Sequence, residues 1–336
     1  MTQFQTPEEK SYQENKKKNL ETLLSDFNCK IDWIWINKAS RRKVTFQIDG
    51  KNHLGFFAAK SHNLIEIDSD PLAEEKISAL IPLLKNFLNR QEQNFYTQLA
   101  VTLFDNGLDV VLHGKKPINF SQEQKMMSFA KENDLNISYR YGNGVAPIFM
   151  ARPNQIFYPD FKIDLTSDIF IQATKAGLEN IVKIIRSSIT PGSKVADIYA
   201  GFGAYSFAIH DLAKSIFAFE GDEIMTDLIR KNATANKLSQ KIKAETRDLF
   251  SNPISKRELK DFDLAIINPP RNGANPQVVE ISKSPLKNLI YVSCNPQSFK
   301  RDAKILIDSG FAIKSLNAID QFYSTEHLEL VAIFQK

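Results

Sequence analysis

The chain has 336 residues, of which 43% are apolar and 24% charged, so it is long enough for two domains and has an ordinary globular composition. Its net charge of +4 permits nucleic-acid binding without demanding it. No apolar run approaches the roughly 18 residues of a membrane span, and the polar N-terminus predicts no signal peptide. Two cysteines, Cys29 and Cys294, exclude a disulfide framework and a four-thiolate metal site, and we expect a reducing cytoplasm.

The first half of the chain predicts an α+β domain with antiparallel hairpins. Thr6-Pro7-Glu8-Glu9 is a capping box with proline at the first helical position, which predicts a helix from Pro7 to Leu24. Its Lys16-Lys17-Lys18 cluster is expected on a solvated face. Asp49-Gly50 and Asp105-Asn106-Gly107 predict hairpin turns. The predicted strands are Lys43–Asp49, Leu54–Ala58, Leu64–Ile67, Gln98–Phe104, Leu108–Leu112 and Ile137–Tyr141, with helices at Leu72–Leu88 and Gln122–Glu132.

The pattern changes after about Phe161, where short apolar strands begin to alternate with helices. Such alternation predicts a parallel, doubly wound sheet. The predicted elements are a helix at Thr174–Ser187 and strands at Val195–Tyr199, Ile216–Glu220, Lys243–Thr246, Phe262–Ile267 and Leu289–Val292. The last two strands, Ile313–Ile319 and Leu328–Phe334, have no helix-length segment between them, so an antiparallel pair is expected.

A glycine loop follows the first strand of this second half. Gly201 and Gly203 let the backbone approach a ligand, with a helix N-terminus directly behind them. A dinucleotide fingerprint needs a third glycine where Ser206 stands, which disfavours NAD.

Three carboxylates accompany that loop. Asp197 lies at the end of the first strand, Glu220 ends the next strand and is expected to bind ribose hydroxyls, and Asp248 is expected to reach an adenine amino group. S-adenosylmethionine has no pyrophosphate, so its loop needs fewer glycines than a dinucleotide loop. The pattern therefore favours S-adenosylmethionine.

Two further strand ends carry reactive groups. In Asn268-Pro269-Pro270-Arg271, the Asn268 side chain and the Pro269 carbonyl suit an amide edge or amino group, and Arg271 suits a phosphate or carbonyl oxygen. Cys294 lies between a buried strand and a helix that begins at Asn295-Pro296, where the helix dipole favours a thiolate. On this stretch alone, a buried structural cysteine is the alternative.

Together these stretches resemble the RNA uridine-5-methyltransferases, which make 5-methyluridine in transfer and ribosomal RNA. The matching segments, in the family's order, are Phe170-Ile171-Gln172, Asp197 to Gly203, Pro269 to Gly273, Ser293-Cys294-Asn295-Pro296 with Arg301-Asp302, and Asp320, Phe322, Thr325, His327 and Glu329. A weaker similarity runs from Arg41 through His62. Five motifs in one order make coincidence an inadequate explanation.

The resemblance implies a fold, a domain order and an RNA partner. The fold is α/β, a class I methyltransferase with a doubly wound, mostly parallel sheet and an antiparallel C-terminal strand. The implied domains are an N-terminal helix at 1–24, an α+β RNA-binding domain at 25–160 and a methyltransferase domain at 161–336. The expected partner is transfer or ribosomal RNA. Apart from the resemblance, we expect a monomer without a metal, and without an iron–sulfur cluster because Cys29 is the only thiol besides Cys294.

The resemblance also implies the roles of single residues. Cys294 would add to carbon 6 of uracil, Glu329 would remove the carbon 5 proton, and His327 would position Glu329. The residues implied to bind S-adenosylmethionine are Gln172, Tyr199, Gly201, Gly203, Ala204, Glu220, Asp248 and Asn268, and those implied to bind RNA are Arg271, Arg41, Arg42 and Lys43. The uridine must leave its stack to reach such a site.

The chain departs from the family at several positions. Asn268 stands where the family has Asp, and Ala200, Thr174 and Tyr323 replace Cys, Asn and Pro. The cysteine cluster of some members and a small β-barrel module are missing from the sequence. Two alternatives stay open: an adenine N6-type amino-group methyltransferase that uses Asn268-Pro269-Pro270-Arg271, and an RNA-binding member that has lost catalysis. A cytosine-5 methyltransferase is disfavoured because the Pro-Pro-Arg segment carries no second cysteine.

Overall fold

A computed structural model describes residues 6–58 and 60–336. The chain forms two compact units: unit 1 comprises Met1–Ile36 and Glu179–Lys336, and unit 2 comprises Asn37–Leu178. This division differs from the expected one, in which the N-terminal helix stood alone and residues 25–160 formed one domain. The reason is an unpredicted strand, Ile31–Trp35, which pairs in parallel with Ala312–Asp320 and so joins the N-terminus to the C-terminal half.

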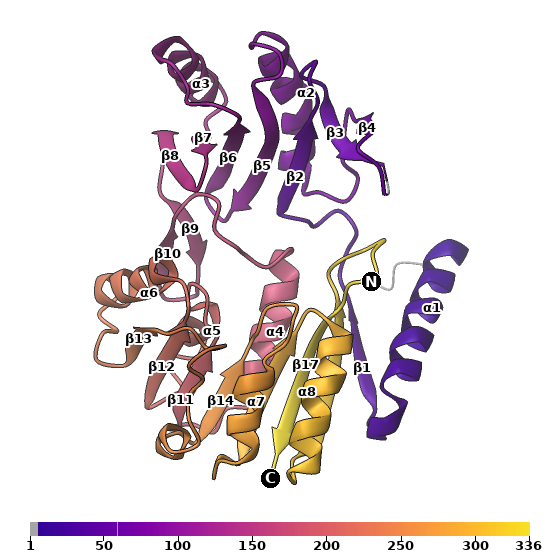
Figure 1. The fold of residues 1–336 in the computed structure, drawn as a ribbon, viewed down its shortest axis with the longest axis vertical. Coiled ribbons are helices and arrows are strands. Elements are labelled where there is room, and N and C mark those ends of the chain that lie inside the picture. The colour runs from indigo at the N-terminus through magenta and orange to yellow at the C-terminus, as the bar shows by residue number, and fades with distance from the viewer. Residues whose placement is uncertain (1–5, 59) are drawn as a thin grey trace. The chain divides into compact units, whose positions relative to one another are not determined.

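Unit 1 is built on an eight-stranded sheet of order β1-β16-β17-β15-β14-β11-β12-β13 (Figure 1). Its strands are β1 (Ile31–Trp35), β11 (Lys194–Ile198), β12 (Ser215–Glu220), β13 (Ile242–Thr246), β14 (Leu264–Ile267), β15 (Asn288–Ser293), β16 (Ala312–Asp320) and β17 (Glu329–Gln335). The neighbouring strands β13, β12, β11, β14 and β15 run parallel to one another, and β17 is antiparallel to both β15 and β16. The predicted parallel sheet with an antiparallel C-terminal strand is confirmed.

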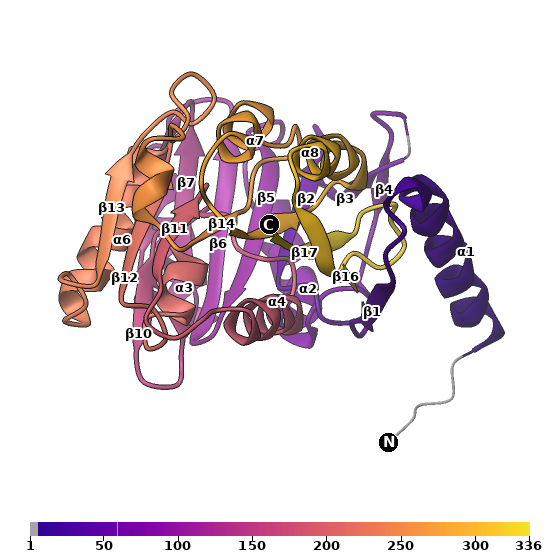
Figure 2. The same cartoon turned by 90° about the horizontal axis from the view of Figure 1, so that it is seen from below.

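Helices cover both faces of this sheet, with α7 and α8 on one side and α4 on the other (Figure 2). The helices are α1 (Pro7–Leu23), α4 (Lys175–Ser187), α5 (Ala204–Ala208), α6 (Glu223–Ala235), α7 (Asn275–Ser282) and α8 (Pro296–Asp308). The capping box predicted at Thr6 and Glu9 is present. Leu20 and Leu24 pack into the same apolar core as Phe299 of α8 and Leu316 of β16, so α1 belongs to this layer.

Unit 2 contains a seven-stranded sheet of order β4-β3-β2-β5-β6-β7-β8 and a separate β9–β10 hairpin. The strands are β2 (Lys43–Ile48), β3 (Leu54–Phe57), β4 (Leu64–Glu66), β5 (Tyr96–Phe104), β6 (Gly107–Gly114), β7 (Asn136–Tyr141), β8 (Gly144–Phe149), β9 (Asn154–Phe157) and β10 (Lys162–Leu165). Helices α2 (Glu75–Asn89) and α3 (Phe120–Glu132) share an apolar core with the sheet. The predicted turn at Asp105-Asn106 joins β5 and β6, whereas β8, β9 and β10 were not predicted.

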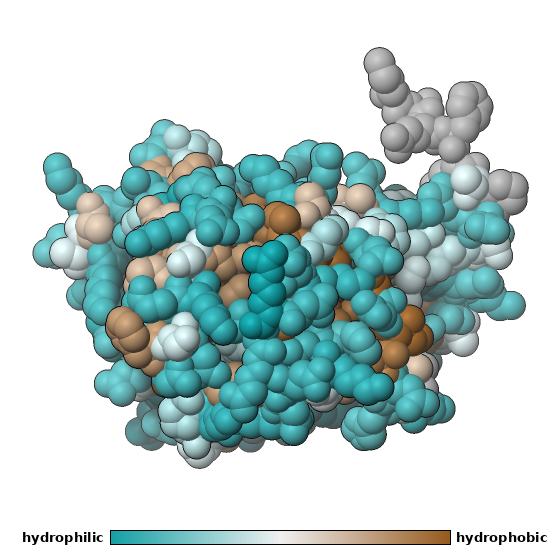
Figure 3. All heavy atoms as spheres, turned by 90° about the horizontal axis from the view of Figure 1, so that it is seen from above, coloured by the Kyte–Doolittle hydropathy of each residue, from teal (hydrophilic) through white to brown (hydrophobic). Residues whose placement is uncertain are grey.

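The outer face shown in Figure 3 carries mostly hydrophilic residues, with hydrophobic ones scattered between them. Across residues 6–58 and 60–336, no helix combines the length and apolar character needed to cross a membrane.

Candidate active site

The loops after β11, β14 and β15 meet at one edge of the sheet in unit 1, because the carboxyl ends of parallel neighbours lie together. The Asn268 N–H donates to the Ile198 carbonyl at 3.1 Å, which ties the loop after β14 to the end of β11. In the same way, the Ala200 N–H donates to the Phe219 carbonyl at 3.1 Å. The sheet therefore gathers segments that are far apart in the sequence into one site.

Cys294 lies between β15 and α8, as the sequence predicted. The antiparallel register pairs Ser293 with Leu330, so Cys294 and Glu329 follow at the same end of β15 and β17. Asn295 caps α8 and accepts a hydrogen bond from the Gln297 N–H at 3.0 Å. Strand pairing, rather than proximity in sequence, brings the thiol to the carboxyl group.

The Cys294 thiol is less acidic than its place before a helix N-terminus suggested. Burial raises its pKa, the charge of Glu329 raises it further, and the charge and hydrogen bond of Arg271 lower it. The expected preference for thiolate is therefore wrong for the protein by itself. Asn295 already satisfies the first free N–H of the helix, and burial outweighs what remains of the helix dipole.

Glu329 is 2% exposed, and its burial raises the pKa of its carboxyl group to about 7. The Gln321 amide donates to its Oε2 at 3.1 Å, which opposes that rise only in part. A carboxyl group with a pKa near neutrality exchanges a proton readily at cellular pH, which suits a general base.

Arg271 and His327 form a pair at the mouth of the site. The Arg271 guanidinium donates to His327 Nε2 at 3.0 Å, so that nitrogen is the unprotonated one. Burial, followed by the charges of Arg271 and Lys16, lowers the pKa of His327. The neutral imidazole therefore orients Arg271, and the described contacts of His327 do not include Glu329, which Gln321 contacts instead.

The loop after β14 is held from behind by Asp302. Its buried carboxylate accepts hydrogen bonds from the Tyr291 hydroxyl at 2.7 Å and the Ala274 N–H at 2.7 Å. Asn295 Nδ2 also donates to the Arg271 carbonyl at 2.9 Å. Gly273 has a φ of +80°, and a Cβ there would lie 2.6 Å from Asp302 Oδ2, so only glycine fits. The Arg301-Asp302 segment thus positions Arg271 through the backbone.

The glycine loop after β11 is arranged around Glu220 and Asp197. One oxygen of Glu220 accepts from the Gly201 N–H at 2.9 Å and the other from the Gly221 N–H at 2.8 Å. Asp197 is fully buried and accepts from the N–H and hydroxyl of Ser206, and burial raises its pKa to about 6. Ser206, which stands where a dinucleotide loop needs glycine, therefore has a structural partner.

The other predicted cofactor residues of unit 1 lie around this loop. Tyr199 has a φ of 62°, and its buried hydroxyl has no hydrogen-bond partner within the described part of the chain. Asp248 Oδ2 accepts from the Ser251 hydroxyl at 2.7 Å, so it shapes its own turn. Asn268 Nδ2 donates to the Tyr205 hydroxyl at 3.4 Å, and Ala204 begins α5.

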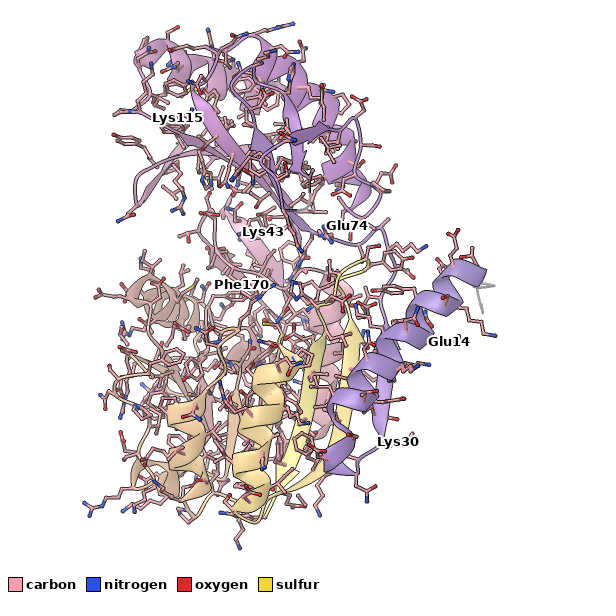
Figure 4. All side chains as sticks on the ribbon, turned by 45° about the vertical axis from the view of Figure 1, so that its right-hand side comes forward. Glu14, Lys30, Lys43, Glu74, Lys115 and Phe170 are labelled. Atoms are coloured by element: carbon pink, nitrogen blue, oxygen red, sulfur yellow. The ribbon has the colours of Figure 1, made fainter. Side chains whose placement is uncertain are left out.

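The remaining predicted site residues belong to unit 2, and two of them contact the backbone of that unit. Arg42 is 2% exposed, and its Nε donates to the Gln172 carbonyl at 3.0 Å. Lys43 donates to the Ile169 carbonyl at 2.8 Å and faces Asp168; Figure 4 labels Lys43 and Phe170 in this region. Both side chains hold the segment that carries Gln172, and their predicted role in RNA binding stays a prediction. Arg41 is partly exposed and stays a candidate.

A pocket of about 340 Å³ opens at Cys294 and includes a wall that the sequence did not predict. Arg271, Cys294 and His327 line it together, and α1 contributes Lys16, Asn19, Leu20 and Leu23. Lys16 was expected in solvent but is 7% exposed and ion-paired with Asp320. The sequence could have indicated this burial, because Lys16 lies four residues before Leu20 and residues at that spacing share one face of a helix.

Comparison with known proteins agrees with the motifs. The model of the family described as tRNA (uracil-5-)-methyltransferase matches residues 8–336. An uncharacterized RNA methyltransferase of Zymomonas mobilis is 30% identical over 303 residues, which are 88% of this chain and 75% of that protein. The 23S rRNA (uracil(1939)-C(5))-methyltransferase RlmD of Shewanella halifaxensis is 28% identical over 318 residues, which are 90% of this chain and 70% of that protein.

Among solved structures, the tRNA (uracil-54, C5)-methyltransferase of Pyrococcus abyssi, in complex with S-adenosyl-L-homocysteine, superposes with a TM-score of 0.76. The two sequences are 21% identical, and the match covers 96% of this chain and 83% of the other, which establishes the shared fold. With a family model that spans nearly the whole chain and a fold to match, this protein belongs to the tRNA (uracil-5-)-methyltransferase family.

Proposed function

We propose that this protein methylates carbon 5 of a uridine in a structured transfer or ribosomal RNA, through a covalent bond between Cys294 and carbon 6 of the base. The observation that carries the proposal is the meeting of Cys294, Arg271 and His327 in one pocket beside the buried Glu329. The similar proteins of known substrate act on transfer RNA in one case and ribosomal RNA in the other, so both classes stay in the proposal.

The residues around the glycine loop fit S-adenosylmethionine. A Cβ added at Gly201 would meet no described atom within 4 Å, so a ligand has room to approach that backbone. Within residues 6–58 and 60–336, the buried Tyr199 hydroxyl and Asp197 Oδ1 have no hydrogen-bond partner, and buried polar atoms of this kind are often completed by a ligand. The residues proposed to hold the cofactor are Tyr199, Gly201, Gly203, Ala204, Glu220, Asp248 and Asn268, all of which belong to unit 1. S-adenosylmethionine supplies a methyl group activated by its positive sulfur.

Cys294 starts the chemistry, because carbon 5 of uracil is by itself a weak nucleophile. The Cys294 thiolate forms an Sγ–C6 bond, and the electrons of the C5–C6 double bond move toward carbon 5 and the neighbouring carbonyl oxygen. Carbon 5, which still carries its proton, would then take the methyl group of bound S-adenosylmethionine as the bond between that methyl group and the sulfur breaks. Arg271, which lowers the pKa of Cys294, favours the thiolate that this addition needs.

Glu329 completes the reaction. Its carboxylate accepts the carbon 5 proton, the C5–C6 double bond reforms, and the Sγ–C6 bond breaks to return the Cys294 thiolate. Its raised pKa of about 7 makes the carboxylate a stronger base than an exposed glutamate. Amino-group methylation of adenine would leave Cys294 and Glu329 without a role, so we do not retain that alternative.

The proposal is tested by trapping the covalent bond with an RNA that contains 5-fluorouridine. Fluorine at carbon 5 cannot leave as a proton does, so the Cys294 adduct should persist after methyl transfer. We expect a protein–RNA band that resists denaturing electrophoresis and requires S-adenosylmethionine. Cys294→Ser should abolish the band, and Cys29→Ser is the matched control that should keep it, since Cys29 packs in the core of unit 1. An RNA-binding protein that forms no adduct would refute the covalent mechanism.

A further inference from the structure

Helix α1 carries a buried polar network that the proposed chemistry does not use. Lys16 Nζ lies 2.8 Å from Asp320 Oδ1 and donates to the Tyr12 hydroxyl at 2.8 Å, and that hydroxyl donates to Asp320 Oδ2 at 2.9 Å. The Lys16 and Asp320 side chains are 8% and 2% exposed. Burying an ion pair carries a large desolvation cost, so such a pair is a weak source of stability and a better means of fixing one arrangement.

The network holds the segment that leads to the proposed base. Asp320 ends β16 and also accepts from the Phe322 N–H at 3.2 Å. The Tyr12 ring packs against Tyr323 with 4.8 Å between ring centroids. Between Asp320 and β17 the chain passes through Gln321, which donates to Glu329, and His327, which accepts from Arg271. Helix α1 therefore fixes the start of the segment that carries Gln321 and His327 to β17.

The same helix faces the reaction. Lys16, Asn19, Leu20 and Leu23 form one wall of the pocket that contains Cys294. Asn19 is exposed, and none of the described hydrogen bonds or ion pairs involves its side chain. α1 lies beside α8, which begins just after Cys294 (Figures 1 and 4). The helix thus reaches the site both through Asp320 and directly across the pocket.

We propose that α1 is part of the active site: Lys16 is a positioning residue that sets the segment 321–328 through Asp320, and Asn19 borders the RNA nucleotide that enters the pocket. This inference rests on the proposed roles of Cys294 and Glu329. It assigns the N-terminal helix to substrate binding and turnover rather than to an independent module.

Steady-state methylation of RNA by the full chain tests the positioning role. Lys16→Met removes the ion pair and should lower kcat by about 10- to 100-fold, the loss expected when reacting groups shift by about 1 Å, with little change in KM for S-adenosylmethionine. Lys16→Arg keeps the charge and should recover most of the rate. Lys18→Met, on the exposed face two residues away, is the control and should match the wild type. A Lys16→Met variant that folds and keeps the wild-type kcat overturns this role.

Asn19→Trp tests the pocket wall and does not depend on the buried pair. Because Asn19 is exposed, the variant should fold, narrow the pocket and raise KM for RNA several-fold while the thermal unfolding midpoint stays unchanged. An unchanged KM for RNA overturns the assignment of Asn19 to the pocket wall. This holds even if Lys16→Met proves too unstable to assay. Adduct formation by the wild type with 5-fluorouridine RNA separates the proposed function from the proposed role of α1. If that adduct is missing, the proposed function fails. If the adduct forms while both α1 variants behave like the wild type, only the proposed role of α1 fails.

Discussion

Replacing Glu329 with glutamine should make the protein inactive and, at alkaline pH, more stable. The Glu329 pKa rises from 4.5 to about 7 on folding because the carboxyl group is buried. Between those two values the unfolded chain has lost the proton while the folded protein keeps it, so the free energy of unfolding falls as pH rises through this window. Above about pH 7, folding carries the full free-energy cost of burying the Glu329 carboxylate. The rise of the Glu329 pKa from 4.5 to about 7 corresponds to a free-energy cost of roughly 3 kcal/mol.

Glutamine has nearly the same shape and no charge to bury. We therefore expect Glu329→Gln to match the wild type near pH 4.5 and to exceed it by up to about 3 kcal/mol at pH 8. Urea unfolding at both pH values measures this difference, and Glu326→Gln, an exposed neighbour, is the control for loss of one carboxylate. A stability difference that stays constant between the two pH values would refute the buried-carboxylate reasoning.

The same variant tests the catalytic role. Loss of a general base should lower kcat by about 10²- to 10⁴-fold. The methylated RNA should accumulate as a covalent complex with Cys294, because the carbon 5 proton can no longer be removed. Normal turnover by Glu329→Gln would show that another group accepts the proton.

Two further predictions concern the loop after β14. Arg271 lowers the pKa of Cys294, so Arg271→Met should raise that pKa. The pH midpoint of iodoacetamide alkylation, measured on a Cys29→Ser background, should therefore move upward. An unmoved midpoint would contradict the electrostatic role of Arg271. Gly273→Ala should lose more stability in urea unfolding than Gly192→Ala. Both glycines have positive φ, which costs an L-residue roughly 1–2 kcal/mol, but only Gly273 would also press a Cβ against Asp302, whereas at Gly192 no described atom lies within 4 Å. Equal losses would mean that the loop moves aside at no cost.

Local signals predicted most of the secondary structure. The Thr6 capping box, the Asp105-Asn106 turn and the Asn295-Pro296 helix start are each set by a few neighbouring residues, and the structure has all three. The strand Ile31–Trp35 escaped prediction because its pattern is not a clean alternation and its pairing partner, β16, lies nearly 300 residues away. A strand of this kind is defined by the sheet that it joins.

The sequence by itself determined the family of this protein through the order of its motifs, and the resemblance to that family implied the roles of Cys294 and Glu329. Only the tertiary structure decided the electrostatic state of these groups, since burial and neighbouring charges depend on what the sheet brings together. It made Cys294 harder to ionise, raised the pKa of Glu329 and paired His327 with Arg271. It also moved Lys16 from the expected surface into the site, through a partner more than 300 residues distant in the chain.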